Sequence, residues 1–152
     1  MTNREAASAW TSWSVILRWP WITALVAAAV VDLYFAIIRR FDFVGITGFS
    51  TLNYGWLAFG VAGGFVFAWR LARRFIGWRA VWRTFIAPLS AFFLVFVAVV
   101  LTGLVFIPEQ PVRETFLTDA PGRAIWVGAA VLVGSAVIEA VRAISHTAAR
   151  RR

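Results

Sequence analysis

Two acidic side chains lie inside long apolar segments of this sequence, and they are the residues best placed to do chemistry. Asp32 interrupts the apolar segment 19–38, and Glu139 lies near the end of the apolar segment 124–141. A carboxylate in a membrane-length segment is costly, and such residues often mark a proton or ion pathway. The sequence therefore predicts Asp32 and Glu139 as intramembrane polar candidates.

Asp32 allows two interpretations. It shares a stripe of i+4 spacing with Ala24, Ala28 and Ala36, and small residues on one stripe let a second helix approach closely. On this basis Asp32 faces protein, as a proton or cation site or as a polar clasp to a partner helix. Alternatively, its carboxylate reaches the outer interface or Arg39, which lies on the same helical face about 10 Å further along the axis.

Glu139 has a nearby partner in sequence, because Arg142 follows it at the i+3 spacing of an ordinary helical ion pair. The two carboxylates fall toward opposite sides of the membrane, about 15 Å apart in depth at the rise of a helix. A paired acid–base site is therefore not expected. The chain has no cysteine, a single histidine and no recognised catalytic motif, so we predict neither an enzyme nor a metal site, and no cofactor is assigned.

The composition predicts a membrane protein, because 61% of the residues are hydrophobic and only 14% are charged. Four segments are long enough to cross the hydrocarbon core as helices, at about 17–25 residues each. They are residues 19–38, 52–69, 85–106 and 124–141. The predicted fold class is all-α: one domain, 1–152, formed by an integral membrane bundle of four transmembrane helices.

The residues before the first segment have their own pattern. Trp10, Trp13 and Leu17 follow helical spacing, which is typical of a short helix lying in the membrane interface. The alternative is a disordered tail whose tryptophans partition individually.

Small residues at four-residue spacing predict close helix packing. The predicted packing residues are Ala24, Ala28, Gly60, Gly64, Gly128 and Gly134. The pattern favours helix association without distinguishing contacts within one chain from contacts between chains.

Arginine counts predict the orientation, since cytoplasmic flanks of membrane helices are enriched in basic residues. Eleven arginines flank the side that carries both termini and the connection between the second and third segments, and four flank the other side. We therefore expect both termini in the cytoplasm and the chain in a prokaryotic inner membrane.

The connection between the second and third segments is the most basic part of the chain. Its arginines are Arg70, Arg73, Arg74, Arg79 and Arg83. Because all basic residues flank apolar segments and form no separate soluble face, the net charge of +8 indicates anionic lipid headgroups as partners and argues against nucleic acid.

Residues 47–54, Thr-Gly-Phe-Ser-Thr-Leu-Asn-Tyr, resemble the filter loops of Trk/Ktr-type potassium transporters and the Thr-Phe-Ser-Thr break of small fluoride channels. The first resemblance implies a potassium filter, but those proteins carry four such loops with longer pore helices. The second implies dual-topology insertion, which the arginine asymmetry opposes. We identify no family from this stretch.

These observations favour a non-catalytic polytopic membrane protein, an accessory or scaffold subunit associated with other membrane subunits or with itself. The alternative is a homo-oligomeric small channel or transporter that uses Asp32 and the 47–54 loop.

Overall fold

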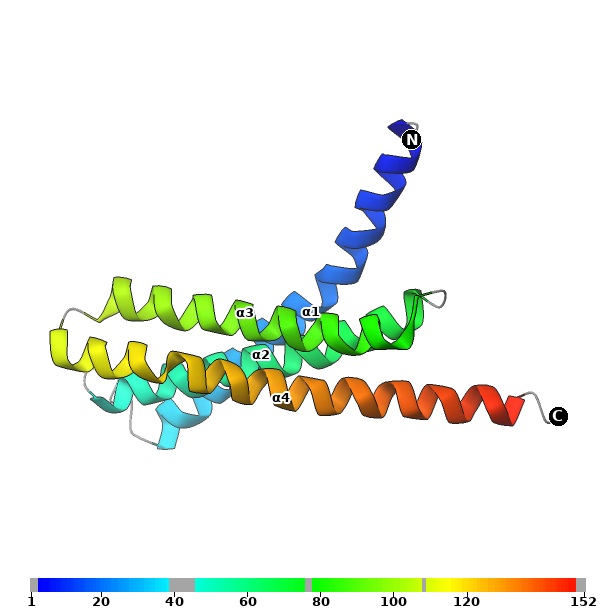
Figure 1. Ribbon diagram of the computed structural model, residues 1–152. Coiled ribbons are helices and arrows are strands. Elements are labelled where there is room, and N and C mark those ends of the chain that lie inside the picture. Colours follow the sequence, from blue (N-terminus) through cyan, green and yellow to red (C-terminus); the bar gives the residue numbers. More distant parts are fainter. Residues whose placement is uncertain (1–2, 39–45, 76–77, 108, 150–152) are drawn as a thin grey trace.

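The computed structural model describes residues 3–38, 46–75, 78–107 and 109–149, and it describes side chains from Ser14 onward except at 46–53 and 106. Four helices account for nearly all of these residues (Figure 1). They are α1 (Asn3–Ile38), α2 (Ile46–Arg74), α3 (Ala80–Phe106) and α4 (Gln110–Ala149). Each is long and apolar enough to cross a membrane. The predicted all-α class with four membrane-length helices is confirmed.

All four helices are longer than the apolar segments that predicted them. The backbone satisfies its hydrogen bonds by continuing the helix into polar flanks, so the ends of the apolar runs do not coincide with the helix ends. The largest difference is in α4, whose 40 residues begin before the predicted segment, at Gln110. Pro111 is tolerated there because the first helical N–H groups have no partner within the helix.

The stretch 47–54 is helical and forms the start of α2, which begins at Ile46. Our prediction of a loop at this position is wrong. Next to a membrane, a helix satisfies backbone N–H and C=O groups that an open loop would leave unpaired.

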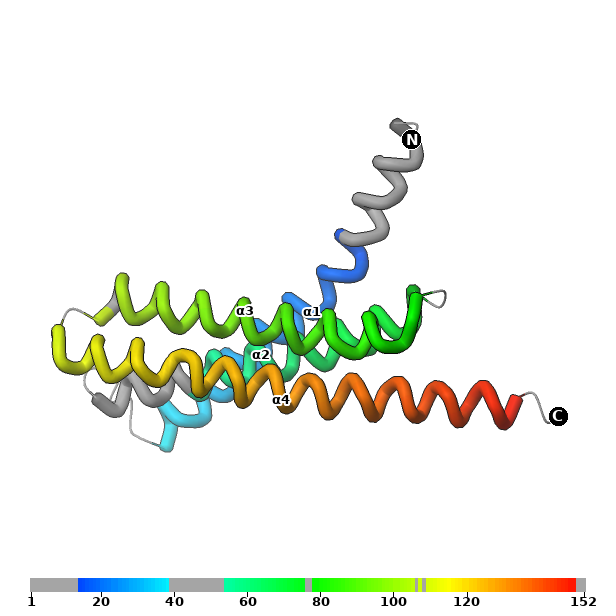
Figure 2. The backbone as a smooth tube through the Cα atoms, in the orientation of Figure 1, coloured from blue at the N-terminus to red at the C-terminus, as the bar shows by residue number. Residues whose placement is uncertain are grey.

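α2 is the central element of the bundle. It packs against α1 on one side and against α3 and α4 on the other, and α3 and α4 form an antiparallel hairpin. Figure 2 shows α3 and α4 side by side along the length of the bundle. Over the described residues, α1 makes close contact with α2 alone. α1 also changes direction along its length (Figure 1), and it contains Pro20, a residue that commonly kinks helices.

The core lies among α2, α3 and α4 and is built from small and β-branched residues. Its fully buried members include Leu71 of α2, Val95 and Val99 of α3, and Val127 and Val131 of α4. One polar contact crosses this core, where the indole Nε1 of Trp56 donates a hydrogen bond of 3.1 Å to Thr102 Oγ1.

The glycines of α2 bring its backbone close to its neighbours. A Cβ atom on Gly60 would overlap Val95 and Val127, and one on Gly64 would overlap Val131. The GxxxG pair therefore packs within the chain, against α3 and α4.

The other predicted packing residues also lie at contacts within the chain. A Cβ on Gly134 would overlap the ring of Phe65, and one on Gly128 would lie 3.4 Å from Phe92 Cβ. Ala24 is buried against Gly63, and Ala28 is half-buried.

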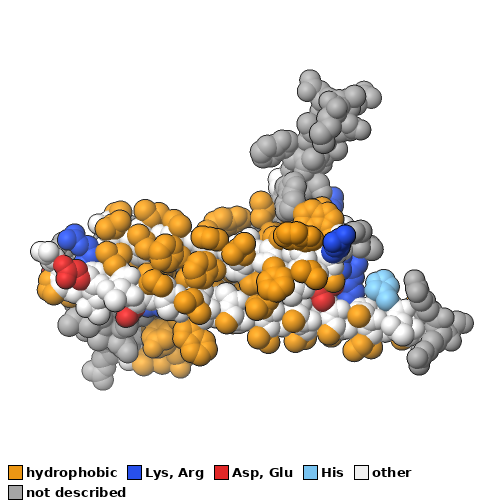
Figure 3. Space-filling view, in the orientation of Figure 1, with side chains coloured by type: hydrophobic (Ala, Val, Ile, Leu, Met, Phe, Trp, Pro, Cys, Tyr) orange, Lys and Arg blue, Asp and Glu red, His pale blue; other side chains and the backbone are white. Residues whose placement is uncertain are grey.

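The surface divides into an apolar middle and charged ends. On the face shown in Figure 3, hydrophobic side chains cover the centre of the bundle and charged side chains gather toward the two ends. On α1, Leu25, Val30 and Leu33 each leave more than half of their surface exposed. This distribution is compatible with a multi-pass integral membrane protein, because lipid can cover apolar side chains that protein leaves exposed.

The close approach at Gly60 generates a prediction. Gly60→Ala should lower the free energy of unfolding by about 1–3 kcal/mol, because the two β-branched valines facing it have little freedom to move away. The measurement is unfolding in a fixed detergent, followed by circular dichroism. Gly122→Ala in α4 is the matched control, since nothing lies within 4 Å of a Cβ built there. Equal losses in the two variants would contradict close packing at Gly60.

Candidate functional site

The most elaborate polar arrangement in the described chain joins Arg83 of α3 to Glu139 of α4. Arg83 Nε donates to Glu139 Oε1 at 2.7 Å, and Arg83 Nη2 donates to Glu139 Oε2 at 2.9 Å. This two-pronged geometry is the strongest form of an arginine–carboxylate pair. Both side chains are largely buried, with 8% of Arg83 and 15% of Glu139 exposed.

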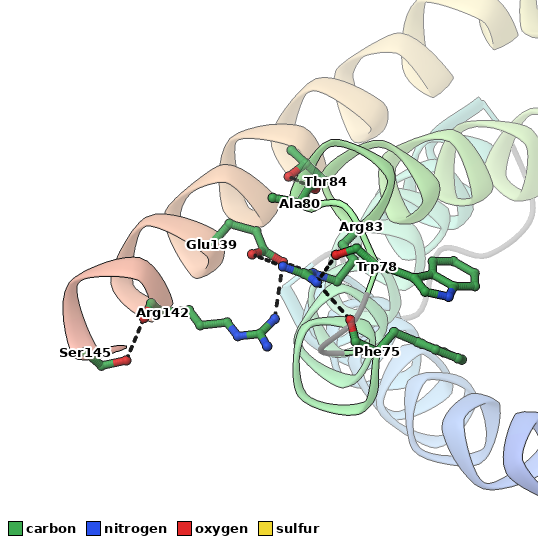
Figure 4. Close-up of polar contacts among 8 residues, drawn as sticks. All are labelled: Phe75, Trp78, Ala80, Arg83, Thr84, Glu139, Arg142 and Ser145. Atoms are coloured by element: carbon green, nitrogen blue, oxygen red, sulfur yellow. Dashed lines mark hydrogen bonds and ion pairs between the residues drawn. The ribbon is translucent and has the colours of Figure 1, made fainter. Parts of the chain in front are cut away.

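The same guanidinium also fixes the connection between α2 and α3. Arg83 Nη1 donates to the carbonyl oxygens of Phe75, at 2.8 Å, and Trp78 (Figure 4). Phe75 and Trp78 stack on one another, with ring centroids 4.5 Å apart. Arg83 therefore ties together the end of α2, the start of α3 and the face of α4. We call this end of the molecule, where α2 ends and α3 begins, the arginine-rich end.

Sequence reasoning missed Arg83 as the partner of Glu139. The expected neighbour, Arg142, does lie near the carboxylate, but its Nη1 is 3.9 Å from Glu139 Oε1, too long for a hydrogen bond. The signal available in the sequence was that Arg83 and Glu139 both lie near the same side of the membrane. The register of α3 against α4, which the spacing of residues does not specify, determines that they meet.

The arginines predicted to bind lipid headgroups separate into two groups. Arg83 turns inward to Glu139. Arg70, Arg73 and Arg74 line a cavity of about 390 Å³ between α1 and α2, and Arg79 is exposed. Arg73 and Arg74 also occupy the last turn of α2, where cations interact favourably with the helix dipole. Headgroup binding by these residues stays a prediction.

Tryptophans hold two of these guanidinium groups in place. Arg70 Cζ lies 5.8 Å from the centroid of the Trp19 ring, and Arg73 Cζ lies 5.0 Å from that of Trp69. Such cation–π contacts favour ordered side chains at a membrane interface.

Asp32 lies far from this cluster, toward the other end of α1. It packs against α2 so closely that a Cβ on Gly55 would overlap its carboxylate. Its Oδ1 atom is buried, and no described residue gives it a hydrogen bond. Arg39, the alternative partner considered above, is outside the described residues. Since the described residues of α1 and α4 are not in contact, Asp32 and Glu139 are not brought together.

No three His, Asp or Glu side chains converge on a possible metal position in the part of the chain that the structure describes. Among the described residues, the arginine-rich end carries several guanidinium groups, and Glu139, the carboxylate beside them, is engaged by Arg83.

The Arg83–Glu139 pair generates a second prediction. Glu139→Gln should lower the free energy of unfolding by about 3 kcal/mol, because it removes the carboxylate that neutralises the buried Arg83 guanidinium. Asp119→Asn, which removes the 57%-exposed carboxylate that pairs with Arg123, should cost less than about 1 kcal/mol. Thermal unfolding of both variants in one detergent makes the comparison. A Glu139→Gln variant as stable as Asp119→Asn would show that the pair contributes little.

Comparison with known proteins adds no relative: no protein-family model, no curated protein and no solved structure matches the chain.

Proposed function

We propose that this chain is a non-catalytic accessory or scaffold subunit of a larger membrane complex. We further propose that it lies in a prokaryotic inner membrane with both termini in the cytoplasm. The observation that carries the proposal is an open apolar groove between α1 and α3.

The groove exists because, among the described residues, α1 packs against α2 and not against α3 or α4. It encloses about 220 Å³. Its lining comes from α1 (Leu17, Pro20, Trp21, Ala24), α2 (Phe59, Gly60, Gly63, Gly64, Phe67) and α3 (Ala87, Ser90, Ala91, Leu94). Small residues along such a groove let a neighbouring helix insert side chains closely, and helix packing in membranes depends on that kind of contact.

The low burial of α1 supports the same proposal. Only 11% of its most apolar stretch is buried inside the chain, against 39% for α2. A helix with so little contact of its own has a face free for another subunit. The proposed orientation rests on the gathering of arginines at one end of the bundle, which the positive-inside rule places in the cytoplasm.

Filling the groove provides the test. Ser90→Trp should place a large ring in the groove and reduce co-purification of partner subunits by about tenfold, equivalent to about 1.4 kcal/mol. Ser90 is exposed, so the substitution does not disturb the core. The measurement is quantitative mass spectrometry of complexes purified in a mild detergent.

Val97→Trp is the matched control, because Val97 lies on the same helix, is 49% exposed and is absent from the groove lining. The proposal predicts that partner subunits co-purify at a fixed stoichiometry with the parent chain and with Val97→Trp. Purification of the parent chain without partners, or equal recovery with both variants, would refute it.

Asp32 favours a second candidate, a homo-oligomeric channel or transporter. Its buried Oδ1 lacks a partner among the described residues, and an unsatisfied carboxylate within a membrane span is costly unless it serves an ion or a proton. The helical start of α2 removes the 47–54 loop from this candidate and leaves Asp32 as its basis.

The channel candidate predicts that liposomes containing the parent chain show ion or proton flux and that liposomes containing Asp32→Asn show none, because the amide is isosteric but uncharged. Both variants should unfold at similar temperatures. Asp119→Asn, which alters an exposed carboxylate in α4, should keep the flux of the parent. Liposomes without flux for the parent chain, or equal flux for parent and Asp32→Asn, would exclude this role for Asp32.

A further inference from the structure

We propose that a pocket between α2 and α4 at the arginine-rich end binds the phosphate group of an anionic phospholipid. The pocket encloses about 330 Å³. It is lined by Trp69, Ala72 and Arg73 of α2 and by Ile138, Val141, Arg142, Ser145 and His146 of α4. This inference is independent of the proposed role as a subunit.

Arg142 contributes its guanidinium group to the lining of this pocket. Its side chain is 17% exposed, and its buried Nη1 atom lies 3.9 Å from Glu139 Oε1, at ion-pair distance but without a hydrogen bond to any described residue. The nearest carboxylate, Glu139, already accepts two hydrogen bonds from Arg83. Figure 4 shows the Arg142 guanidinium beside that pair. A guanidinium group carries five N–H donors, and a phosphate oxygen is an acceptor of the opposite charge.

Arg73 approaches from the opposite wall. Its guanidinium lies over the Trp69 ring at 5.0 Å, and both residues line the pocket. Two arginines from different helices therefore border one cavity, and His146 adds a further ring N–H donor. Because Arg83 neutralises Glu139, the charge around the pocket is positive.

The remaining wall indicates a lipid as the source of the phosphate. Ile138, Val141 and Trp69 are apolar, and Val141 is 57% exposed. Val141 belongs to an exposed apolar stripe on α4 that is formed by Val133, Val137, Val141 and Ile144. An acyl chain can lie along this stripe toward the membrane interior while its headgroup occupies the pocket. A soluble phosphate would gain nothing from the stripe.

The test measures lipid retention by the full chain, using native mass spectrometry with phosphatidylglycerol as the anionic probe and phosphatidylcholine as the zwitterionic comparison. Arg142→Gln and Arg73→Gln should each weaken phosphatidylglycerol retention about fivefold, the effect of one arginine near an anionic headgroup. Arg79→Gln, which removes the same charge from an exposed position at the same end, should have a smaller effect.

A steric variant separates a pocket from a diffuse charged surface. Ser145→Trp should block the cavity and weaken phosphatidylglycerol retention at least fivefold without changing any charge, and Ala143→Trp, outside the lining on the same exposed helix end, should not. Arg73 is exposed and makes no part of the Arg83–Glu139 pair, so Arg73→Gln keeps the test valid if Arg142→Gln unfolds.

Three results would overturn the proposal. The first is equal loss of phosphatidylglycerol in Arg142→Gln, Arg73→Gln and Arg79→Gln together with no effect of Ser145→Trp, which would indicate surface charge alone. The second is equal retention of phosphatidylcholine and phosphatidylglycerol. The third is displacement of the lipid by millimolar inorganic phosphate, which would assign the pocket to a soluble anion.

Discussion

The close approach of α2 to α3 and α4 at Gly60 and Gly64 is the constraint on which the rest of the structure depends. Both positions face β-branched side chains and leave no room for a Cβ. The lack of a side chain at these two positions of α2 therefore sets the distance between the helices. In a lipid environment, helix association relies on such close packing, because apolar side chains gain little by leaving lipid for protein. The positions of α3 and α4, and therefore the alignment of Arg83 with Glu139, follow from this contact.

The Arg83–Glu139 pair then determines the electrostatics of one end of the molecule. The pair neutralises Glu139, the single described carboxylate near the arginines. Arg83 also donates hydrogen bonds to two carbonyl oxygens in the α2–α3 connection. What remains is a set of positive side chains arranged around apolar cavities. Anions with an apolar tail fit such surroundings better than either free ions or purely apolar ligands, because the charged group contacts the positive side chains and the tail contacts the apolar surface.

Much of the fold could be predicted from the sequence, because membrane-length apolar segments constrain secondary structure strongly. The four helices were predicted, whereas their ends were not, since α2 includes the stretch 47–54 that was predicted as a loop and α4 begins at Gln110, before the predicted segment 124–141. The site was harder to predict. Glu139 was predicted as a polar candidate because a carboxylate in a membrane span is costly. The identity of its partner depends on the register of α3 against α4. Arg142 and His146 acquire a shared cavity with Arg73 only when α4 lies against α2.

The single contact of α1 has a consequence for how the chain is made. During synthesis α1 emerges before α2, its partner among the described residues, so a hairpin of these two helices can form before α3 leaves the ribosome. α3 and α4 then form a second hairpin of their own, and the glycines of α2 join the two units. No described contact of α1 involves the C-terminal half, so the contacts of α1 can form in the order in which the helices are synthesised.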